Sequence, residues 1–123
     1  FQIRDDILNL GPGEGYGKEV AGDLYEGKRT LILAHLLANL RPAERKRVIG
    51  LLARPRGAKT AAEMDEVLQL MRERGSLDHA QRVAEERAAR GLEGVRAWLG
   101  RLPDQAAASR VAGLLGDLAD RSA

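Results

Sequence analysis

Residues 1–30 read FQIRDDILNLGPGEGYGKEVAGDLYEGKRT, and this stretch decides both the fold class and the chemistry that we expect. An acidic pair, Asp5 and Asp6, is followed at short range by two spaced lysines, Lys18 and Lys28. Such a set can hold a diphosphate through Mg²⁺ on one side and through ammonium groups on the other.

The helical spacing of the first residues places the acidic pair among polar neighbours. Phe1, Asp5 and Asn9 are spaced i, i+4, i+8, and Gln2 is three residues before Asp5, so these side chains share one helix face. Asp6 lies about 100° round the helix and sits beside them. Mg²⁺ takes oxygen ligands and usually one or two carboxylates plus phosphate oxygens of its substrate. We therefore expect Mg²⁺ as the cofactor, with Asp5, Asp6 and Asn9 as its ligands.

This arrangement resembles the second aspartate-rich region of the trans-isoprenyl diphosphate synthases, the polyprenyl synthetase family. The resemblance rests on FQ-x-x-DD, a glycine-rich loop ending in GK, and DLYEGK with a following Thr30. It implies that Asp5 leads the metal ligands, that Lys18 contacts the allylic diphosphate directly, and that Lys28 is the second lysine. Asp23 matches the acidic position of the motif, and Gln2 matches a glutamine lining the allylic substrate, beside which we place Phe1.

The family resemblance also implies the reaction and the fold. The implied enzyme is a Mg²⁺-dependent prenyltransferase that adds isopentenyl diphosphate to an allylic diphosphate, with Asp5 and Lys18 as its catalytic residues. The implied fold is the all-α bundle of the class I terpenoid synthases. The family's motif usually ends in Asp, so Asn9 is a departure that weakens the attraction for metal.

Two related families fit the acidic pair less well. The second metal motif of class I terpene cyclases would need Ser or Thr at Asn9 and Glu at Gly13, and squalene and phytoene synthases use aspartates spaced DxxxD. Two other classes stay open: a non-catalytic partner subunit, and a helical interaction module that retains the fold. Product chain length cannot be derived from these residues.

The remainder of the chain has the periodicity of helices and no strand-like alternation. We expect helical segments at residues 1–10, 23–40, 42–53, 60–75, 76–99 and 103–120. Pro42 suits the first residue of a helix, Thr60 with Glu63 fits a capping box, and Ser76 could cap the long fifth segment. The whole chain, 1–123, is expected to be the C-terminal part of one polyprenyl synthetase domain: motif at 1–10, lysine loop at 11–30, and helices to 120.

Composition sets the remaining expectations. The chain has 123 residues, 20 basic and 18 acidic side chains and no cysteine, so neither a disulfide framework nor nucleic-acid binding is indicated. No apolar run approaches the roughly 20 residues needed to span a bilayer. The lack of cysteine fits a cytoplasmic protein, and the start at Phe1 inside an expected helix indicates a fragment. The family resemblance implies a homodimer, or pairing with a missing N-terminal half.

We expect structural or solvated roles for the two histidines, the tryptophan and the arginines at helix ends. We expect His35 to be a core histidine, having no second histidine near it, and His79 to be solvated, so neither indicates zinc. Trp98 is expected in the core or between helices. The arginines of residues 41–47 and 54–56 are interpreted as solvated charges at helix ends.

Overall fold

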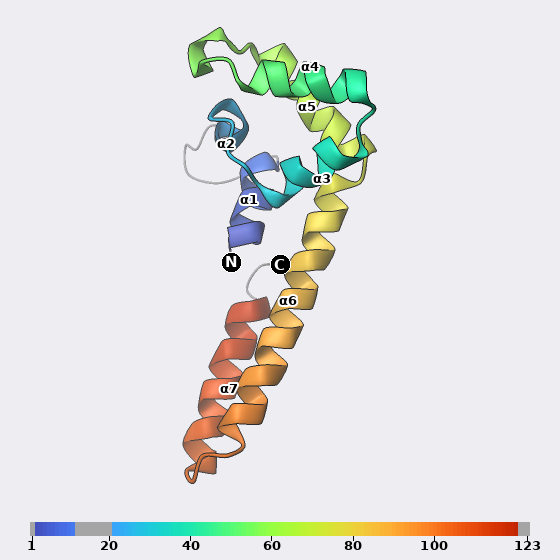
Figure 1. Cartoon of the computed structure of the whole chain (residues 1–123). Coiled ribbons are helices and arrows are strands. Elements are labelled where there is room, and N and C mark those ends of the chain that lie inside the picture. Colours follow the sequence, from blue (N-terminus) through green and yellow to red (C-terminus); the bar gives the residue numbers. More distant parts are fainter. Residues whose placement is uncertain (1, 12–20, 121–123) are drawn as a thin grey trace. The chain divides into compact units, whose positions relative to one another are not determined.

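The computed structural model describes residues 2–11 and 21–120, and in these ranges every regular element is a helix (Figure 1). The elements are α1 (Gln2–Leu10), α2 (Gly22–Tyr25), α3 (Leu31–Asn39), α4 (Pro42–Leu52), the 3-10 helix η1 (Arg56–Ala58), α5 (Ala61–Glu73), α6 (Ser76–Leu99) and α7 (Gln105–Asp120). The expectation of an all-α fold is confirmed over these residues. None of the described helices is long and apolar enough to cross a membrane.

Local signals set most of the helix bounds as expected. Pro42 is the first residue of α4, and the Thr60 hydroxyl accepts from the backbone N–H of Glu63 while the Glu63 carboxylate accepts from the N–H of Thr60. These reciprocal bonds satisfy donors that the first turn of α5 would otherwise leave unpaired. The last segment begins two residues later than predicted, at Gln105, where the Asp104 carboxylate accepts from the N–H of Ala107.

Two predicted features of the first helices differ from the structure. The segment predicted as helix from residue 23 to 40 is broken, because Gly27 adopts a left-handed φ of 70° and α3 starts afresh at Leu31 under a Thr30 cap. Ser76 does not cap α6: it is the first residue of that helix, it is buried, and its hydroxyl lies 3.0 Å from Nδ1 of His35.

The chain divides into two compact units, residues 1–82 and 83–123. In the first unit, α3 packs against α5, and α1 contacts both α2 and α3. The largest fully buried apolar side chains of the described residues all lie there: Ile32, Leu36, Met64, Val67 and Met71.

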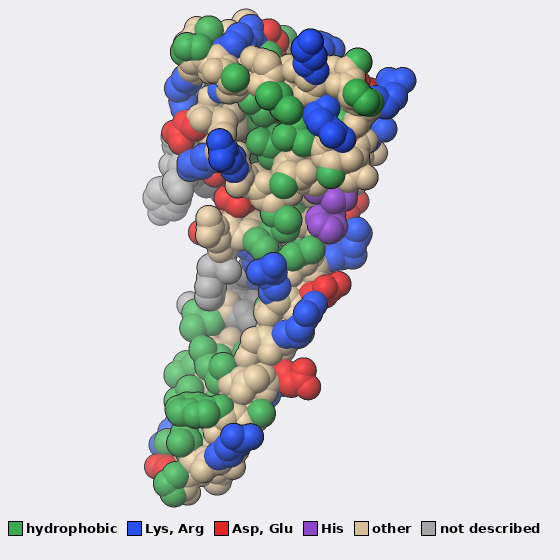
Figure 2. Space-filling view, viewed as in Figure 1, with side chains coloured by type: hydrophobic (Ala, Val, Ile, Leu, Met, Phe, Trp, Pro, Cys, Tyr) green, Lys and Arg blue, Asp and Glu red, His purple; other side chains and the backbone are tan. Residues whose placement is uncertain are grey.

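The second unit pairs the later part of α6 with α7, which run antiparallel (Figure 1). Leu99 and Ala108 are buried in it. The prediction that Trp98 lies in the core is wrong, because this residue is 60% exposed, and the alternative of a contact between helices stays a prediction. Apolar residues therefore cluster on one side of this unit without being covered by it (Figure 2).

Candidate diphosphate site

The described part of the predicted site lies on α1, on α2 and in the turn that follows α2. Gln2, Asp5, Asp6 and Asn9 are on α1, and Lys28 is in the turn. Phe1 and Lys18 lie outside the described residues. α1 is held by its apolar face, since Ile3 and Ile7 pack against the core and Leu10 is buried.

The two aspartates of the pair differ in their surroundings. Asp5 is exposed, as is Gln2, whereas Asp6 is half-buried. Burial raises the pKa of the Asp6 carboxyl, and the negative charges of Asp23 and Asp5 raise it further, while the ammonium of Lys28 acts in the opposite direction. The Asp6 carboxyl is therefore influenced by both members of the Asp23–Lys28 ion pair.

Asn9 has a structural role that the sequence did not reveal. Its side-chain Oδ1 accepts a hydrogen bond from the backbone N–H of Asp23 at 3.1 Å, and its backbone oxygen accepts from the N–H of Ala21 at 2.8 Å. Asn9 thus ties the end of α1 to the start of α2. A carbonyl oxygen has a second lone pair, so a metal-ligand role for Asn9 stays a prediction.

Asp23 and Lys28 form an ion pair across the turn after α2. The Lys28 ammonium donates to Oδ1 of Asp23 and lies 3.7 Å from a carboxylate oxygen of Glu26, and the hydrogen bond to Asp23 is the main reason why the pKa of Lys28 is raised. The Asp23 side chain is only 17% exposed, whereas that of Lys28 is 53% exposed. Lys28 therefore keeps its charge and presents it at the surface.

These side chains suit Mg²⁺ only when the metal binds together with a ligand that supplies further oxygen atoms. Among residues 2–11 and 21–120, no three His, Cys, Asp or Glu side chains are grouped so that they could hold a metal ion by themselves. Mg²⁺ commonly binds one or two carboxylates together with phosphate oxygens. The raised pKa of Asp6 fits this use, because a cation beside it would offset the repulsion from Asp23 and Asp5.

A hollow of about 360 Å³ between α4 and α5 lies apart from these residues. It is lined by apolar side chains and by paired charges: Arg54 lies 2.7 Å from Glu63, and Arg47 lies 2.5 Å from Glu66. Because its arginines are already paired with carboxylates, this hollow lacks the uncompensated cations that a diphosphate needs.

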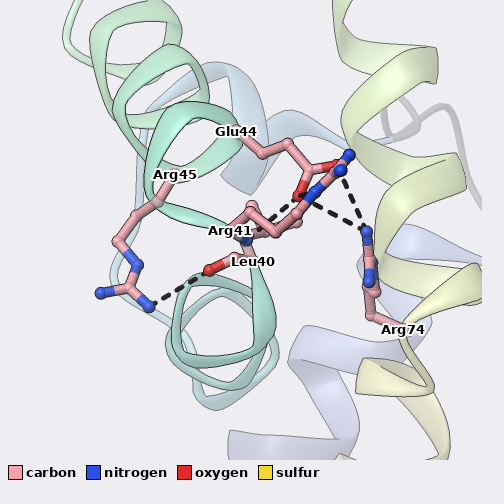
Figure 3. Close-up of polar contacts among 5 residues, drawn as sticks. All are labelled: Leu40, Arg41, Glu44, Arg45 and Arg74. Atoms are coloured by element: carbon pink, nitrogen blue, oxygen red, sulfur yellow. Dashed lines mark hydrogen bonds and ion pairs between the residues drawn. The ribbon is translucent and has the colours of Figure 1, made fainter.

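The arginines at the helix ends form local pairs instead of a phosphate-binding patch. Figure 3 shows Glu44 of α4 between Arg41 and Arg74, with nitrogen to oxygen distances of 2.9 and 3.3 Å. Hydrogen bonds from the side chain and backbone of Arg41 lower the pKa of Glu44 to about 2. Arg45 donates to the backbone oxygen of Leu40, which closes the end of α3. These contacts therefore favour the interpretation of the arginines as charges at helix ends over a phosphate-binding patch.

The two histidines differ from expectation. The rings of His35 and His79 are stacked, with centroids 4.2 Å apart, so His35 does have a second histidine beside it and His79 is half-buried rather than solvated (Figure 2). The Asn39 amide nitrogen donates to the backbone oxygen of His35 at 2.8 Å and lies 3.3 Å from its Nε2. Since an amide nitrogen only donates, Nε2 of His35 accepts and Nδ1 bears the proton that is donated to Ser76. This geometry favours a neutral ring.

Comparison with known proteins gives three informative relatives. The chain is 38% identical over 98 residues to octaprenyl diphosphate synthase of Haemophilus influenzae, covering 77% of this chain and 28% of that protein. It is 32% identical over 121 residues to geranylfarnesyl diphosphate synthase of Natronomonas pharaonis, covering 98% of this chain and 31% of that protein. It is 43% identical over 53 residues to a short chain isoprenyl diphosphate synthase of Methanocaldococcus jannaschii, covering 42% of this chain and 16% of that protein.

The chain thus spans less than a third of the length of these curated relatives. The family model for polyprenyl synthetase matches residues 1–71, which is more than half of the chain and includes α1, the lysine turn and the helices that bury the core. The family expected from the aspartates and lysines is confirmed, and the chain belongs to the polyprenyl synthetase family.

Proposed function

We propose that the protein containing this chain is a prenyltransferase that adds isopentenyl diphosphate to an allylic diphosphate and so makes a polyprenyl diphosphate. Membership of the polyprenyl synthetase family supports the reaction class. The observation that carries the proposal is geometric: the N–H of Asp23 donates to Asn9 on the helix of the acidic pair, and the Asp23 carboxylate pairs with Lys28, so α1 is joined to the lysine turn.

These residues would act on the diphosphate leaving group. Lys28 is charged, half-exposed and held by Asp23, so it can exchange one anionic partner for another with little rearrangement. A fixed cation near the leaving group stabilises charge that grows in the transition state. Lys18, Gln2 and Phe1 are proposed as further substrate contacts, with Asp5 and Lys18 as catalytic residues.

Asp5, Asp6 and the Asn9 carbonyl are the proposed Mg²⁺ ligands, and the metal would supply neutralisation of the diphosphate when bound with the substrate. Asn9 would meanwhile keep its bond to the N–H of Asp23, which fixes the distance between the acidic pair and the turn. We further propose residues 1–123 as the C-terminal part of one synthetase domain that acts in the cytoplasm, as a homodimer or paired with an N-terminal half.

The test is an assay of prenyl transfer from allylic and isopentenyl diphosphates with Mg²⁺, using the gene product that contains these residues. We expect turnover, and a loss of about two orders of magnitude or more in Asp5→Ala, because a carboxylate that holds the metal cannot be replaced by a methyl group. Unchanged thermal unfolding of the variant would show that the loss is chemical. Turnover that survives in Asp5→Ala would contradict the ligand assignment, and a protein that is silent alone but activates a catalytic chain would be a partner subunit.

A further inference from the structure

Lys59 is a buried lysine in the basic segment between α4 and α5. Only 8% of the residue is exposed, and its ammonium donates to the backbone oxygen of Tyr25 at 2.5 Å. Burial lowers the pKa of Lys59, and the positive charges of Arg54 and Arg56 lower it further. A cation in this position is electrostatically costly, so its hydrogen bond to the backbone of a distant segment needs an explanation.

The segment that Lys59 contacts is the turn from Tyr25 to Lys28. Two hydrogen bonds close it: the N–H of Gly27 donates to the oxygen of Leu24, and the N–H of Lys28 donates to the oxygen of Asp23. The turn ends at Lys28, whose ammonium pairs with Asp23. Any displacement of the turn would therefore move the Lys28 ammonium.

The turn packs against the end of α4 and against the basic segment that contains Arg56 and Lys59. A Cβ atom added to Gly27 would lie 3.2 Å from the backbone oxygen of Leu52 and 3.8 Å from Nζ of Lys59. Arg56 lies over the Tyr25 ring at 5.5 Å and 3.7 Å from Glu26. These contacts come from residues 25 to 34 positions further along the chain, so they define where the turn lies relative to the rest of the unit.

We propose that Lys59 is a positioning residue, which anchors the carbonyl of Tyr25 and thereby holds the Lys28 ammonium in place for a diphosphate. The inference rests on the proposed function for the role of Lys28, but the anchoring itself does not. A lysine can do this because its long apolar stem is buried while its terminal donor reaches a carbonyl that an apolar residue would leave unbonded.

The test uses five variants of the 123-residue chain, of which four are Lys59→Met, Lys28→Met, the double variant, and Lys46→Met as a control. Lys46 is an exposed lysine of α4, so its replacement makes the same charge change without touching the turn. Methionine keeps an unbranched stem of similar length and removes the donor. Arg56→Gln is a second variant that affects the same turn, because Arg56 contacts Tyr25 and Glu26. Its side chain is about half exposed, so this variant keeps the test available if Lys59→Met does not fold.

The first measurement is amide hydrogen exchange without any ligand. Because a hydrogen bond from a charged donor is lost, we expect the amides of Gly27 and Lys28 to exchange about tenfold faster in Lys59→Met, with the amides of α5 unchanged. Arg56→Gln should give a smaller increase at the same amides, and Lys46→Met none. Unchanged exchange in the turn of Lys59→Met, or an equal increase throughout α5, would overturn the proposal whatever the protein binds.

The second measurement is the affinity for inorganic pyrophosphate with Mg²⁺. We expect Lys59→Met to weaken binding about threefold to tenfold in the parent background and to have no further effect in Lys28→Met, since a residue that acts through Lys28 is coupled to it. Equal effects in both backgrounds would overturn positioning through Lys28. If the parent chain binds no pyrophosphate, the proposed function fails while the exchange experiment still decides the anchoring of the turn.

Discussion

The two compact units of this chain bury their apolar side chains to very different extents. In residues 2–11 and 21–82, Ile32, Leu36 and Met64 are at most 1% exposed, and α1 packs against this core through Ile3 and Ile7. In the described residues of the second unit, Leu114 and Trp98 remain more than half exposed (Figure 2). The family model ends at residue 71, inside the first unit.

This difference in burial indicates which unit supplies more of the stability of the fold. A helix of the first unit is stabilised by burial, which supplies most of the stability of helices in proteins. The helices of the second unit meet along Leu99 and Ala108 and leave apolar surface uncovered. We therefore expect the first unit to determine the stability of the site and the second to tolerate substitution.

The largest effect should come from shortening a core side chain. Leu36→Ala removes a side chain with no exposed surface, and we expect it to lower the free energy of unfolding by about 2 to 5 kcal/mol. Leu114→Ala on α7 is the matched control, because this leucine is 64% exposed, and we expect a change within about 0.5 kcal/mol. Urea unfolding followed by circular dichroism measures both, and similar losses in the two variants would contradict the contrast between the units.

The same substitution should have opposite signs in the two units. Gly27→Ala forces an alanine into a left-handed φ of 70° against the oxygen of Leu52, so we expect a loss of about 1 kcal/mol or more. Gly94→Ala lies in the exposed interior of α6 with nothing within 4 Å of the added atom, so we expect a gain of about 0.5 to 1 kcal/mol. Thermal unfolding of both variants is the measurement. A gain in Gly27→Ala would mean that the turn before Lys28 is not constrained as described.

A smaller effect should appear as a pH dependence of stability that arises from groups in the first unit. Burial lowers the pKa of His35 from its ordinary value of 6.5, with His79 and Arg82 acting in the same direction. As the pH falls below about 6.5 the unfolded chain binds the proton first, so stability is lost on acidification and retained above that pH. Glu44 and Glu63, whose pKa values are lowered to about 2, lose their contributions only below about pH 4.5.

His35→Gln keeps a hydrogen-bonding side chain but does not titrate, so its urea midpoint should vary less between pH 7.5 and 5 than that of the parent. A titration of His35 by NMR would report the pKa directly. A value above 6.5, or an unchanged pH slope in the variant, would show that the His35 ring is not held neutral.

The features that depend on neighbouring residues along the chain could be predicted from the sequence. Pro42, the box of Thr60 with Glu63, and the helix from Gln2 to Leu10 follow from local propensity and capping, and the structure has them where they were expected. The aspartates and lysines were sufficient to identify the family. The break at Gly27 was missed because the apolar residues that follow mimic a continuous helix, and a glycine that takes a left-handed φ is identified only by its contacts.

The contacts that fix the tertiary structure of the first unit join residues far apart in sequence. Asn9 bonds to Asp23, Lys59 to Tyr25, and His35 to Ser76, over separations of 14, 34 and 41 residues. No local pattern indicates which donor meets which acceptor, because the pairing depends on how helices pack. The expectation that Trp98 lies in the core failed for the same reason, because burial of a side chain depends on which helices pack against it.

The central claim is that α1 and the turn after α2 bind a diphosphate together with Mg²⁺, and calorimetric titration of inorganic pyrophosphate into this chain tests it most directly. We predict saturable binding that requires Mg²⁺ and is weakened about tenfold or more in both Asp5→Ala and Lys28→Met, whereas Lys46→Met binds as the parent does. Binding that is equally strong without Mg²⁺, or that is unaffected by both site substitutions, would contradict the account.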